Sequence, residues 1–207
     1  MPQLLKGAQV TVALTVLAVS TGLVLSLFLA MGKMSKNKFI SKLCSAYIFF
    51  FRGTPLLMQL FFIYYALPIL IPALTINNRF FAAFIAFSLN AAAYLAEILR
   101  AGFQSIDKEQ YEESRVLGLS YMQTMRYIII PQAIRRLIPP VSNEFIMMLK
   151  DTSLVSIIAL VDITRATRRI QDSTASTLIY IPAMILYLLI TAVFTIVFNK
   201  LEKKYSD

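Results

Sequence analysis

Residues 10–31 read VTVALTVLAVSTGLVLSLFLAM, and no charged residue occurs between Lys6 and Lys33. A bilayer core about 30 Å thick requires roughly 20 apolar residues of α-helix. This stretch meets both conditions, so it predicts a membrane-spanning helix. The stretch is longer than the core of a secretory signal, which has about 7–15 residues, and no A-x-A-like cleavage site follows it. We therefore expect the helix to be retained.

Four further stretches of the 207-residue chain have similar length and hydrophobicity. They cover about residues 56–74, 80–99, 139–161 and 178–198. The chain is 58% hydrophobic and 15% charged, whereas soluble domains are about 45–50% apolar and about 25% charged. The sequence predicts an all-α polytopic membrane protein with five transmembrane helices in a single domain, residues 1–207.

The basic residues indicate an orientation in the membrane. With the N-terminus outside, the inner segments hold fourteen Lys and Arg residues and the outer segments hold five. The five outer residues are Lys6, Arg79, Arg165, Arg168 and Arg169. Because basic residues concentrate on the cytoplasmic side, we expect the N-terminus outside and the C-terminus in the cytoplasm. The net charge of +9 is then explained mainly by the orientation of the chain in the lipid bilayer, which is the expected partner. No nucleic-acid partner is expected.

Several kinds of active site are excluded by composition. The chain has no His and one Cys, Cys44, which excludes histidine metal sites, Ser-His triads and an internal disulfide. A phosphate-binding loop of the form G-x-x-x-x-G-K-[ST] is missing, because Gly32-Lys33 is followed by Met34 and Leu27 replaces the first glycine. We expect no catalytic residue, metal site or cofactor in this chain.

Two carboxylates lie inside the fourth stretch, where ionisable groups cost roughly 3 kcal/mol and are candidates for function. Glu144 and Asp151 are seven positions apart, so they share one helical face. A carboxylate pair lining a cavity would suit one or two ammonium groups. The alternative is a structural ion pair with Lys150.

Three other polar residues are candidates for the same pathway: Arg52, Gln59 and Asn90. Arg52 could bind a carboxylate of the substrate or act as a gate. The alternative is that it anchors the chain at the cytoplasmic interface. Glu97 and Arg100, three residues apart, are expected to pair with each other. The apolar stretch 43–51 is too short to span the bilayer and predicts a helix lying along the inner leaflet.

The polar loop at about residues 105–131 contains two helix-start patterns. Asp107 with Gln110, and Ser120 with Gln123, each have capping-box spacing. Gly118 predicts the end of the first helix, and Pro131 predicts the end of the second. The loop is either a solvated helical hairpin or an element that a partner grips in a groove.

The same loop resembles the EAA loop of ABC-importer permeases. Glu112-Glu113-Ser114, three residues, Gly118, nine residues and Ile128-Ile129-Ile130-Pro131 match its spacing. The departures are Glu113 and Ser114 for two alanines, and Ile130 for leucine. Four further blocks resemble the polar amino-acid permeases of that family, of the His, Glu, Gln, Arg and opine type: RGTPLL from Arg52, AYLAEILRAG from Ala93, IPQAI from Ile130 and KDTSL from Lys150.

The resemblance implies a type I importer permease in the bacterial cytoplasmic (inner) membrane. It implies a second permease, identical or homologous, two ABC ATPase subunits that bind ATP and Mg²⁺, and an extracytoplasmic amino-acid-binding protein. The expected ATPase-coupling residues are Glu112, Arg115, Leu117, Gly118, Leu119 and Met122. In the family, charged residues of the fourth span are thought to line the amino-acid site, which implies a polar or cationic amino acid as cargo. The alternative hypothesis is an autonomous ion channel or secondary carrier that uses Glu144 and Asp151.

Overall fold

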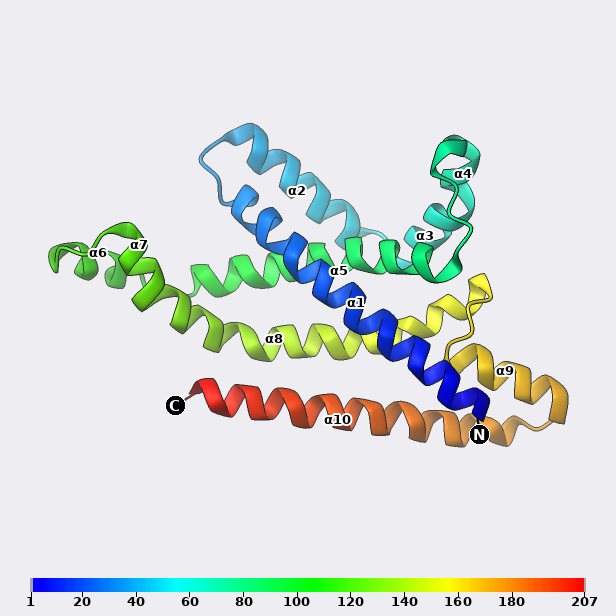
Figure 1. Ribbon diagram of the computed structural model, residues 1–207. Coiled ribbons are helices and arrows are strands. Elements are labelled where there is room, and N and C mark those ends of the chain that lie inside the picture. The colour runs from blue at the N-terminus through cyan, green and yellow to red at the C-terminus, as the bar shows by residue number, and fades with distance from the viewer. Residues whose placement is uncertain (1, 207) are drawn as a thin grey trace.

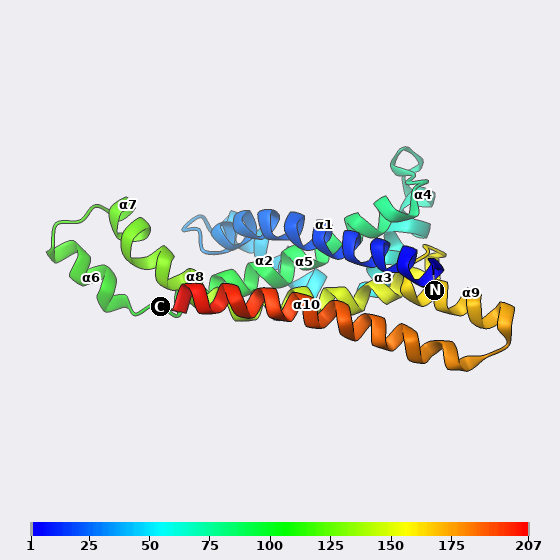
Figure 2. The same cartoon turned by 60° about the horizontal axis from the view of Figure 1, so that its bottom comes forward.

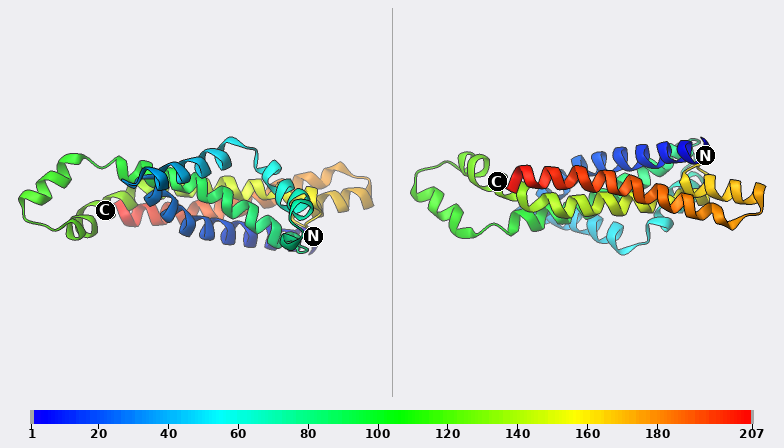
Figure 3. Two further views of the ribbon diagram at one scale, coloured as in Figure 1. Left: turned by 90° about the horizontal axis from the view of Figure 1, so that it is seen from above. Right: turned by 90° about the horizontal axis from the view of Figure 1, so that it is seen from below.

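A computed structural model describes residues 2–206, which form an elongated helical bundle without a strand among those residues. Helices α6 and α7 lie at one end of the bundle (Figure 1). The start of α1 and helix α9 lie at the opposite end, and the long helices run between the two ends (Figure 2). The views from above and below show the same elongated shape, with the α6–α7 loop projecting beyond the helices (Figure 3).

Three helices of the described residues are long and apolar enough to cross a membrane. They are α1 (Pro2–Lys33), α5 (Arg79–Gln104) and α10 (Tyr180–Ser206), the last preceded by a 3₁₀ turn η5 (Thr177–Ile179). Continuous helix therefore covers the expected spans 10–31, 80–99 and 178–198. The most extensive contact in the bundle is that of α1 with α5, and α10 packs mainly against α8.

The expected span over residues 56–74 is wrong as a single helix. The structure instead has α3 (Leu56–Phe61), a π-helical turn η1 (Phe62–Ala66), α4 (Leu67–Leu70) and a 3₁₀ turn η2 (Pro72–Leu74). The preceding helix α2 (Lys38–Gly53) completes this element, with a bend of 103° between α2 and the α3–α4 pair. Only together are they long and apolar enough to cross a membrane, either as a broken span or as a re-entrant loop.

The bend has a local cause at Gly53-Thr54-Pro55. Thr54 has an extended backbone (φ −115°, ψ 145°), as expected for a residue that precedes proline. The stretch 43–51, expected along the inner leaflet, belongs to α2, which packs against α1 and α5. Arg52 is the next-to-last residue of α2, so it lies at the bend.

Pro131 does not end a helix, contrary to expectation. After α7 (Tyr121–Thr124), a π-helical turn η3 (Met125–Ile129) leads directly into α8 (Ile130–Asp151), which carries Pro131 in its first turn. The wider π-turn gives the proline ring room where a regular turn would place a clashing carbonyl. Helix α8 continues through Pro139 and Pro140, and the 3₁₀ helix η4 (Thr152–Ile158) follows it. The predicted span over residues 139–161 is therefore wrong as a single helix, and α8 is not among the three helices of the described residues that are long and apolar enough to cross a membrane.

An ionic cluster fixes α1 to α5 near the end of the bundle that carries the α6–α7 loop. The predicted pairing of Glu97 with Arg100 is confirmed. The second oxygen of Glu97 also accepts a hydrogen bond from the Lys33 Nζ at 2.7 Å. Lys33 is the last residue of α1, so the cluster joins two helices that are far apart in sequence.

Candidate functional site

A polar cavity of about 470 Å³ lies where three elements meet: the α2–α3 elbow, α5 and α8. Four of the five residues predicted for the pathway line it: Arg52, Asn90, Glu144 and Asp151. The fifth, Gln59, does not. The bend after Gly53 brings the end of α2 to this level, opposite the α8 face that carries the two carboxylates.

The carboxylates of Glu144 and Asp151 line one cavity, which Arg52 also lines. Glu144 is 7% exposed, and Asp151 is half-buried. Among residues 2–206 neither carboxylate forms an ion pair, and Lys150 is exposed and does not pair with them. Two acids that line one low-dielectric cavity repel each other, so a cation in the cavity would be attracted to both.

Arg52 supplies the opposite charge on the same cavity. Its guanidinium carbon lies 5.3 Å from the centre of the Tyr94 ring, which is a cation–π contact. Tyr94 lines the cavity one helical turn after Asn90. Sequence reasoning missed Tyr94, although its position four residues after Asn90 on the same helical face was a usable signal.

Gln59 stabilises the elbow instead of lining the polar cavity. Its Nε2 donates to the Phe51 carbonyl at 2.8 Å and to the Thr54 Oγ1 at 2.8 Å. Its Oε1 accepts from Asn90 Nδ2 at 3.0 Å, and the same Asn90 nitrogen donates to the Phe51 carbonyl at 3.1 Å. Asn90 therefore has a buried partner, and the amide pair joins α5 to the elbow.

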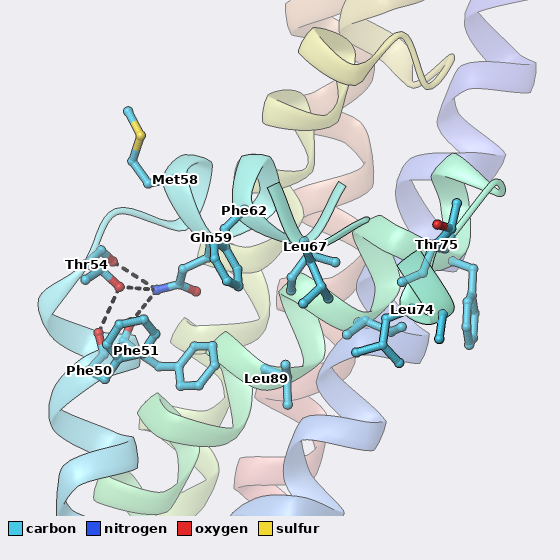
Figure 4. A pocket seen from close by; sticks show the side chains of 15 residues that line it. Phe50, Phe51, Thr54, Met58, Gln59, Phe62, Leu67, Leu74, Thr75 and Leu89 are labelled. Atoms are coloured by element: carbon cyan, nitrogen blue, oxygen red, sulfur yellow. Dashed lines mark hydrogen bonds between the residues drawn. The ribbon is translucent and has the colours of Figure 1, made fainter. Parts of the chain in front are cut away.

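A second cavity of about 640 Å³ lies on the other side of the elbow and is almost entirely apolar. Figure 4 shows Gln59 reaching back from α3 toward Thr54, while Phe51, Phe62, Leu67 and Leu89 surround the cavity with hydrocarbon. Thr54 lines both cavities. The α2–α3 elbow thus contributes to the lining of both the charged cavity and the apolar cavity.

The loop that resembles the EAA motif is a pair of short, well-capped helices. Helix α6 (Lys108–Val116) ends in a Schellman motif at Gly118, which has φ +76°. The Leu119 amide donates to the Ser114 carbonyl at 3.0 Å, and the Gly118 amide donates to the Arg115 carbonyl at 3.0 Å. The predicted stop at Gly118 is confirmed.

The two predicted capping boxes differ in outcome. At Ser120 the box is complete, since the Ser120 amide donates to Gln123 Oε1 at 2.8 Å and the Gln123 amide donates to Ser120 Oγ at 3.3 Å. At Asp107 the side chain caps nothing, which contradicts the prediction. Its expected partner Gln110 pairs with Gln132 of α8 instead.

A buried hydrogen bond joins α6 to α7. The Thr124 Oγ1 lies 3.0 Å from Ser114 Oγ, and these residues are 3% and 1% exposed. Ser114 is one of the positions that depart from the EAA pattern, and its hydroxyl is used here as an internal contact. Sequence reasoning missed this pair and the Gln110–Gln132 pair, because both join residues on different short helices.

The predicted coupling residues lie on the outer surface of this loop. Glu112, Arg115 and Leu119 line a hollow of about 400 Å³ together with Tyr111 and Tyr121. Partial burial and the neighbouring Tyr121 raise the pKa of Tyr111, so its hydroxyl stays protonated. Leu117 and Met122 are 76% and 72% exposed. A charged hollow edged by exposed apolar side chains suits contact with a partner protein.

Comparison with known proteins gives this arrangement a context. In sequence, the chain is 38% identical to the L-cystine transport system permease protein TcyB of Bacillus subtilis (strain 168), over 98% of this chain and 86% of the relative. It is 36% identical to the glutamine transport system permease protein GlnP of Escherichia coli (strain K12), over 98% of this chain and 93% of the relative.

Solved structures agree with the sequence comparisons. A structure described as an amino acid ABC transporter with histidines has a chain that is 41% identical, with a TM-score of 0.90 over 98% of this chain and 94% of its own. A chain of the MetNI methionine ABC transporter in an inward-facing conformation shares the fold, with a TM-score of 0.83 over 99% and 97% of the two chains at 16% identity. The family model described as the binding-protein-dependent transport system inner membrane component matches residues 22–207. This chain therefore belongs to the family of binding-protein-dependent transport system inner membrane components.

Proposed function

We propose that this chain is the membrane-spanning subunit of an ATP-driven amino-acid importer and that the polar cavity holds the amino acid during its passage. The observation that carries the proposal is the placement of Arg52 on one side of a cavity and Glu144 and Asp151 on another. An amino acid carries an ammonium group and a carboxylate, so it matches a cavity with charges of both signs. The relatives named in amino-acid transport systems support this cargo class.

Each charged group has an expected role. Arg52 binds the α-carboxylate, because a guanidinium presents paired N–H donors that fit a carboxylate. Glu144 and Asp151 bind ammonium or guanidinium groups, with one acid for the α-ammonium and one for a cationic side chain. Asn90 positions the elbow that carries Arg52. Two acids and a single arginine on the cavity favour a polar or cationic amino acid.

Energy comes from partner subunits in this proposal. Two ABC ATPase subunits bind ATP and Mg²⁺ and hold the loop through Glu112, Arg115, Leu117, Gly118, Leu119 and Met122. A second permease, identical or homologous, completes the pathway, and an extracytoplasmic binding protein delivers the amino acid. The chain lies in the bacterial cytoplasmic (inner) membrane with its N-terminus outside, so that the α6–α7 loop faces the cytoplasm.

The loop is suited to transmit motion because it is rigid. Closure of the ATPase pair draws two such loops together and opens the pathway outward, and hydrolysis resets it. A flexible loop would absorb the displacement. Here the Schellman motif, the capping box at Ser120 and the Ser114–Thr124 hydrogen bond hold α6 and α7 in one arrangement.

The test is transport by the complete complex in proteoliposomes. Arginine, lysine, glutamine and cystine are supplied with the binding protein, and uptake and ATP hydrolysis are measured together. We expect Glu144→Gln and Asp151→Asn to reduce uptake of cationic amino acids at least tenfold. The matched control is Lys150→Gln, which changes an exposed charge next to Asp151 and should have little effect.

The same vesicles separate this proposal from an autonomous channel or carrier. Vesicles that contain the permease without ATPase subunits should take up no amino acid. Uptake driven by an ion gradient in their absence would reject the importer and favour the carrier.

A further inference from the structure

One group of charged residues has no role in the transport proposal. Four of the five basic residues expected on the outer side, Lys6, Arg165, Arg168 and Arg169, occur in α1 and α9. Helix α9 (Ile163–Thr174) packs against the start of α1, at the end of the bundle opposite the α6–α7 loop (Figure 1). These exceptions to the positive-inside pattern therefore gather on two adjoining helices.

The close approach of α1 to α9 depends on Gly7. A Cβ atom at Gly7 would lie 2.6 Å from the Asp162 carbonyl oxygen and 2.8 Å from the Ile163 nitrogen, closer than atoms can pack. Only glycine permits this backbone contact. Lys6 adjoins Gly7, so it lies on the turn of α1 that contacts α9.

A pocket of about 330 Å³ lies at this contact. It is lined by Gln3, Lys6, Val161, Ala166, Arg169 and Ser173. Four of these side chains carry N–H or O–H donors, two of them with a positive charge, and none is a carboxylate. Within residues 2–206, neither Lys6 nor Arg169 forms an ion pair. The pocket has the donors and charge of an anion site without an internal anion.

The arginines of α9 form no ion pair among the described residues, and the nearby buried carboxylate of Asp162 accepts hydrogen bonds from the backbone amides of Thr164 and Arg165. Arg165 and Arg169 are one helical turn apart, and like charges at that spacing destabilise a helix. The Arg165 Nε is buried and has no hydrogen-bond partner among the described residues. Asp172, one turn beyond Arg169, is exposed and forms no ion pair in the described part of the chain. A bound anion would relieve this repulsion.

We propose that this pocket binds a phosphate group, either that of an anionic phospholipid or inorganic phosphate. A guanidinium, an ammonium, an amide and a hydroxyl suit a phosphate, which accepts several hydrogen bonds on oxygens that carry negative charge. The pocket adjoins the start of the apolar run of α1, and basic pockets between membrane helices bind anionic headgroups on the cytoplasmic side of other membrane proteins. Phosphate binding at this pocket is independent of amino-acid transport. The orientation of the chain decides only which leaflet the pocket faces.

The experiment uses the complete complex in nanodiscs of phosphatidylglycerol and phosphatidylcholine in equal parts. After extraction, the ratio of the two lipids that remain bound is measured by mass spectrometry. We expect enrichment of phosphatidylglycerol in the wild type and its loss in Lys6→Ala/Arg169→Ala. The matched control is Arg168→Ala, which removes the same charge from the same helix outside the pocket and should retain the enrichment. Lys6→Arg/Arg169→Lys, which conserves both charges, should also retain it.

A second arm distinguishes the source of the phosphate. Complexes in phosphatidylcholine alone are titrated with inorganic phosphate, and the phosphorus NMR line width is followed. Broadening by the wild type and not by the double alanine variant, without lipid enrichment, supports a site for soluble phosphate. Equal enrichment and equal broadening in wild type and variant overturn the proposal. Loss of stimulation by the binding protein with both phosphate signals unchanged also overturns it and assigns the cluster to protein docking. Basal ATP hydrolysis and elution volume verify folding of each variant.

Discussion

Gln110 and Gln132 hydrogen-bond to each other through their side-chain amides. The Gln110 Nε2 donates to Gln132 Oε1 at 3.1 Å, and the Gln132 Nε2 donates back to Gln110 Oε1 and to the Ile128 carbonyl at 2.9 Å. Helix α6 of the loop is thereby fixed to the first turn of α8. Since α8 also carries Glu144 and Asp151, one helix connects the coupling loop to the cavity.

We expect Gln132→Leu to weaken the transmission between ATP hydrolysis and transport. The change removes both amide hydrogen bonds to Gln110, each of which contributes about 1 kcal/mol. ATP hydrolysis should continue while the amount of amino acid taken up per ATP falls several-fold, as measured in proteoliposomes. The control is Gln171→Leu, which removes the acceptor of a hydrogen bond from the Tyr180 hydroxyl at the opposite end of the bundle. An unchanged ratio in Gln132→Leu would contradict the role of the pair.

Substitutions of Gly118 test whether the backbone conformation of the turn after α6 is needed for coupling. Its φ of +76° disfavours residues with a Cβ, at a cost of roughly 1–2 kcal/mol, and no atom lies within 4 Å of the position where a Cβ would be. Gly118→Val should therefore disturb the turn alone and uncouple ATP hydrolysis from uptake while the complex remains assembled. Gly118→Asn should retain more coupling, because Asn tolerates the left-handed conformation. Equal, normal coupling in both variants would count against the turn as a coupling element.

These two loop features differ in how far the sequence could predict them. Gly118 and the Ser120–Gln123 box were predictable, because each depends on residues a few positions apart. Gln110 had the spacing to return to Asp107, yet it bonds to Gln132 across a tertiary contact. Local spacing gives no information on such competition, and the same limit hid the pairing of Lys33 with Glu97.

The Ser114–Thr124 hydrogen bond is suited to a double-mutant cycle. Ser114→Ala leaves the buried Thr124 hydroxyl without this partner and should cost about 1–3 kcal/mol of stability. Adding Thr124→Val removes the unpaired hydroxyl and should recover part of that loss. Thermal unfolding of the wild type, Ser114→Ala, Thr124→Val and the double variant measures the coupling energy between the two hydroxyls. Additive effects would mean that the two hydroxyls do not depend on each other.

Asn90 is expected to stabilise the elbow. Asn90→Leu leaves Gln59 Oε1 without its donor in a buried position, at a cost of about 1–3 kcal/mol. The melting temperature of the purified complex should fall by several degrees, and Arg52 should lose its fixed position. The control is Asn77→Leu, at an exposed position before α5. A variant as stable as the wild type would show that the amide pair does not hold the elbow.

Arg52 is expected to govern affinity for the amino acid. Arg52→Gln removes the proposed carboxylate partner and should raise the concentration for half-maximal uptake about tenfold, equivalent to about 1.4 kcal/mol. Arg52→Lys should be intermediate, because it keeps the charge and loses the paired donors. Initial uptake rates over a range of amino-acid concentrations provide the measurement. Comparable values for all three proteins would exclude Arg52 from binding.

The cavity shows a further limit of prediction from sequence. Glu144 and Asp151 were identifiable because charges are rare inside an apolar stretch. The elbow was not, because the stretch 56–74 after Gly53-Thr54-Pro55 is long and apolar enough to be predicted as a separate span, whereas the stretch 43–51 before it is too short. The position of Arg52 depends on this tertiary bend. Its Tyr94 partner follows from the same bend, although the spacing from Asn90 pointed to the correct helical face.

The consecutive prolines of α8 have a mechanical consequence. Pro139 and Pro140 lack N–H groups, so the carbonyls of Arg135 and Arg136 receive no helical hydrogen bond from them. Two adjacent gaps in the hydrogen-bond ladder allow the helix to change its angle there without breaking a bond. Because the gaps lie between Gln132 and Glu144, we expect any bending of α8 to occur between the loop and the carboxylates. A small tilt of the loop end can therefore turn the carboxylates without pulling the rest of the bundle apart.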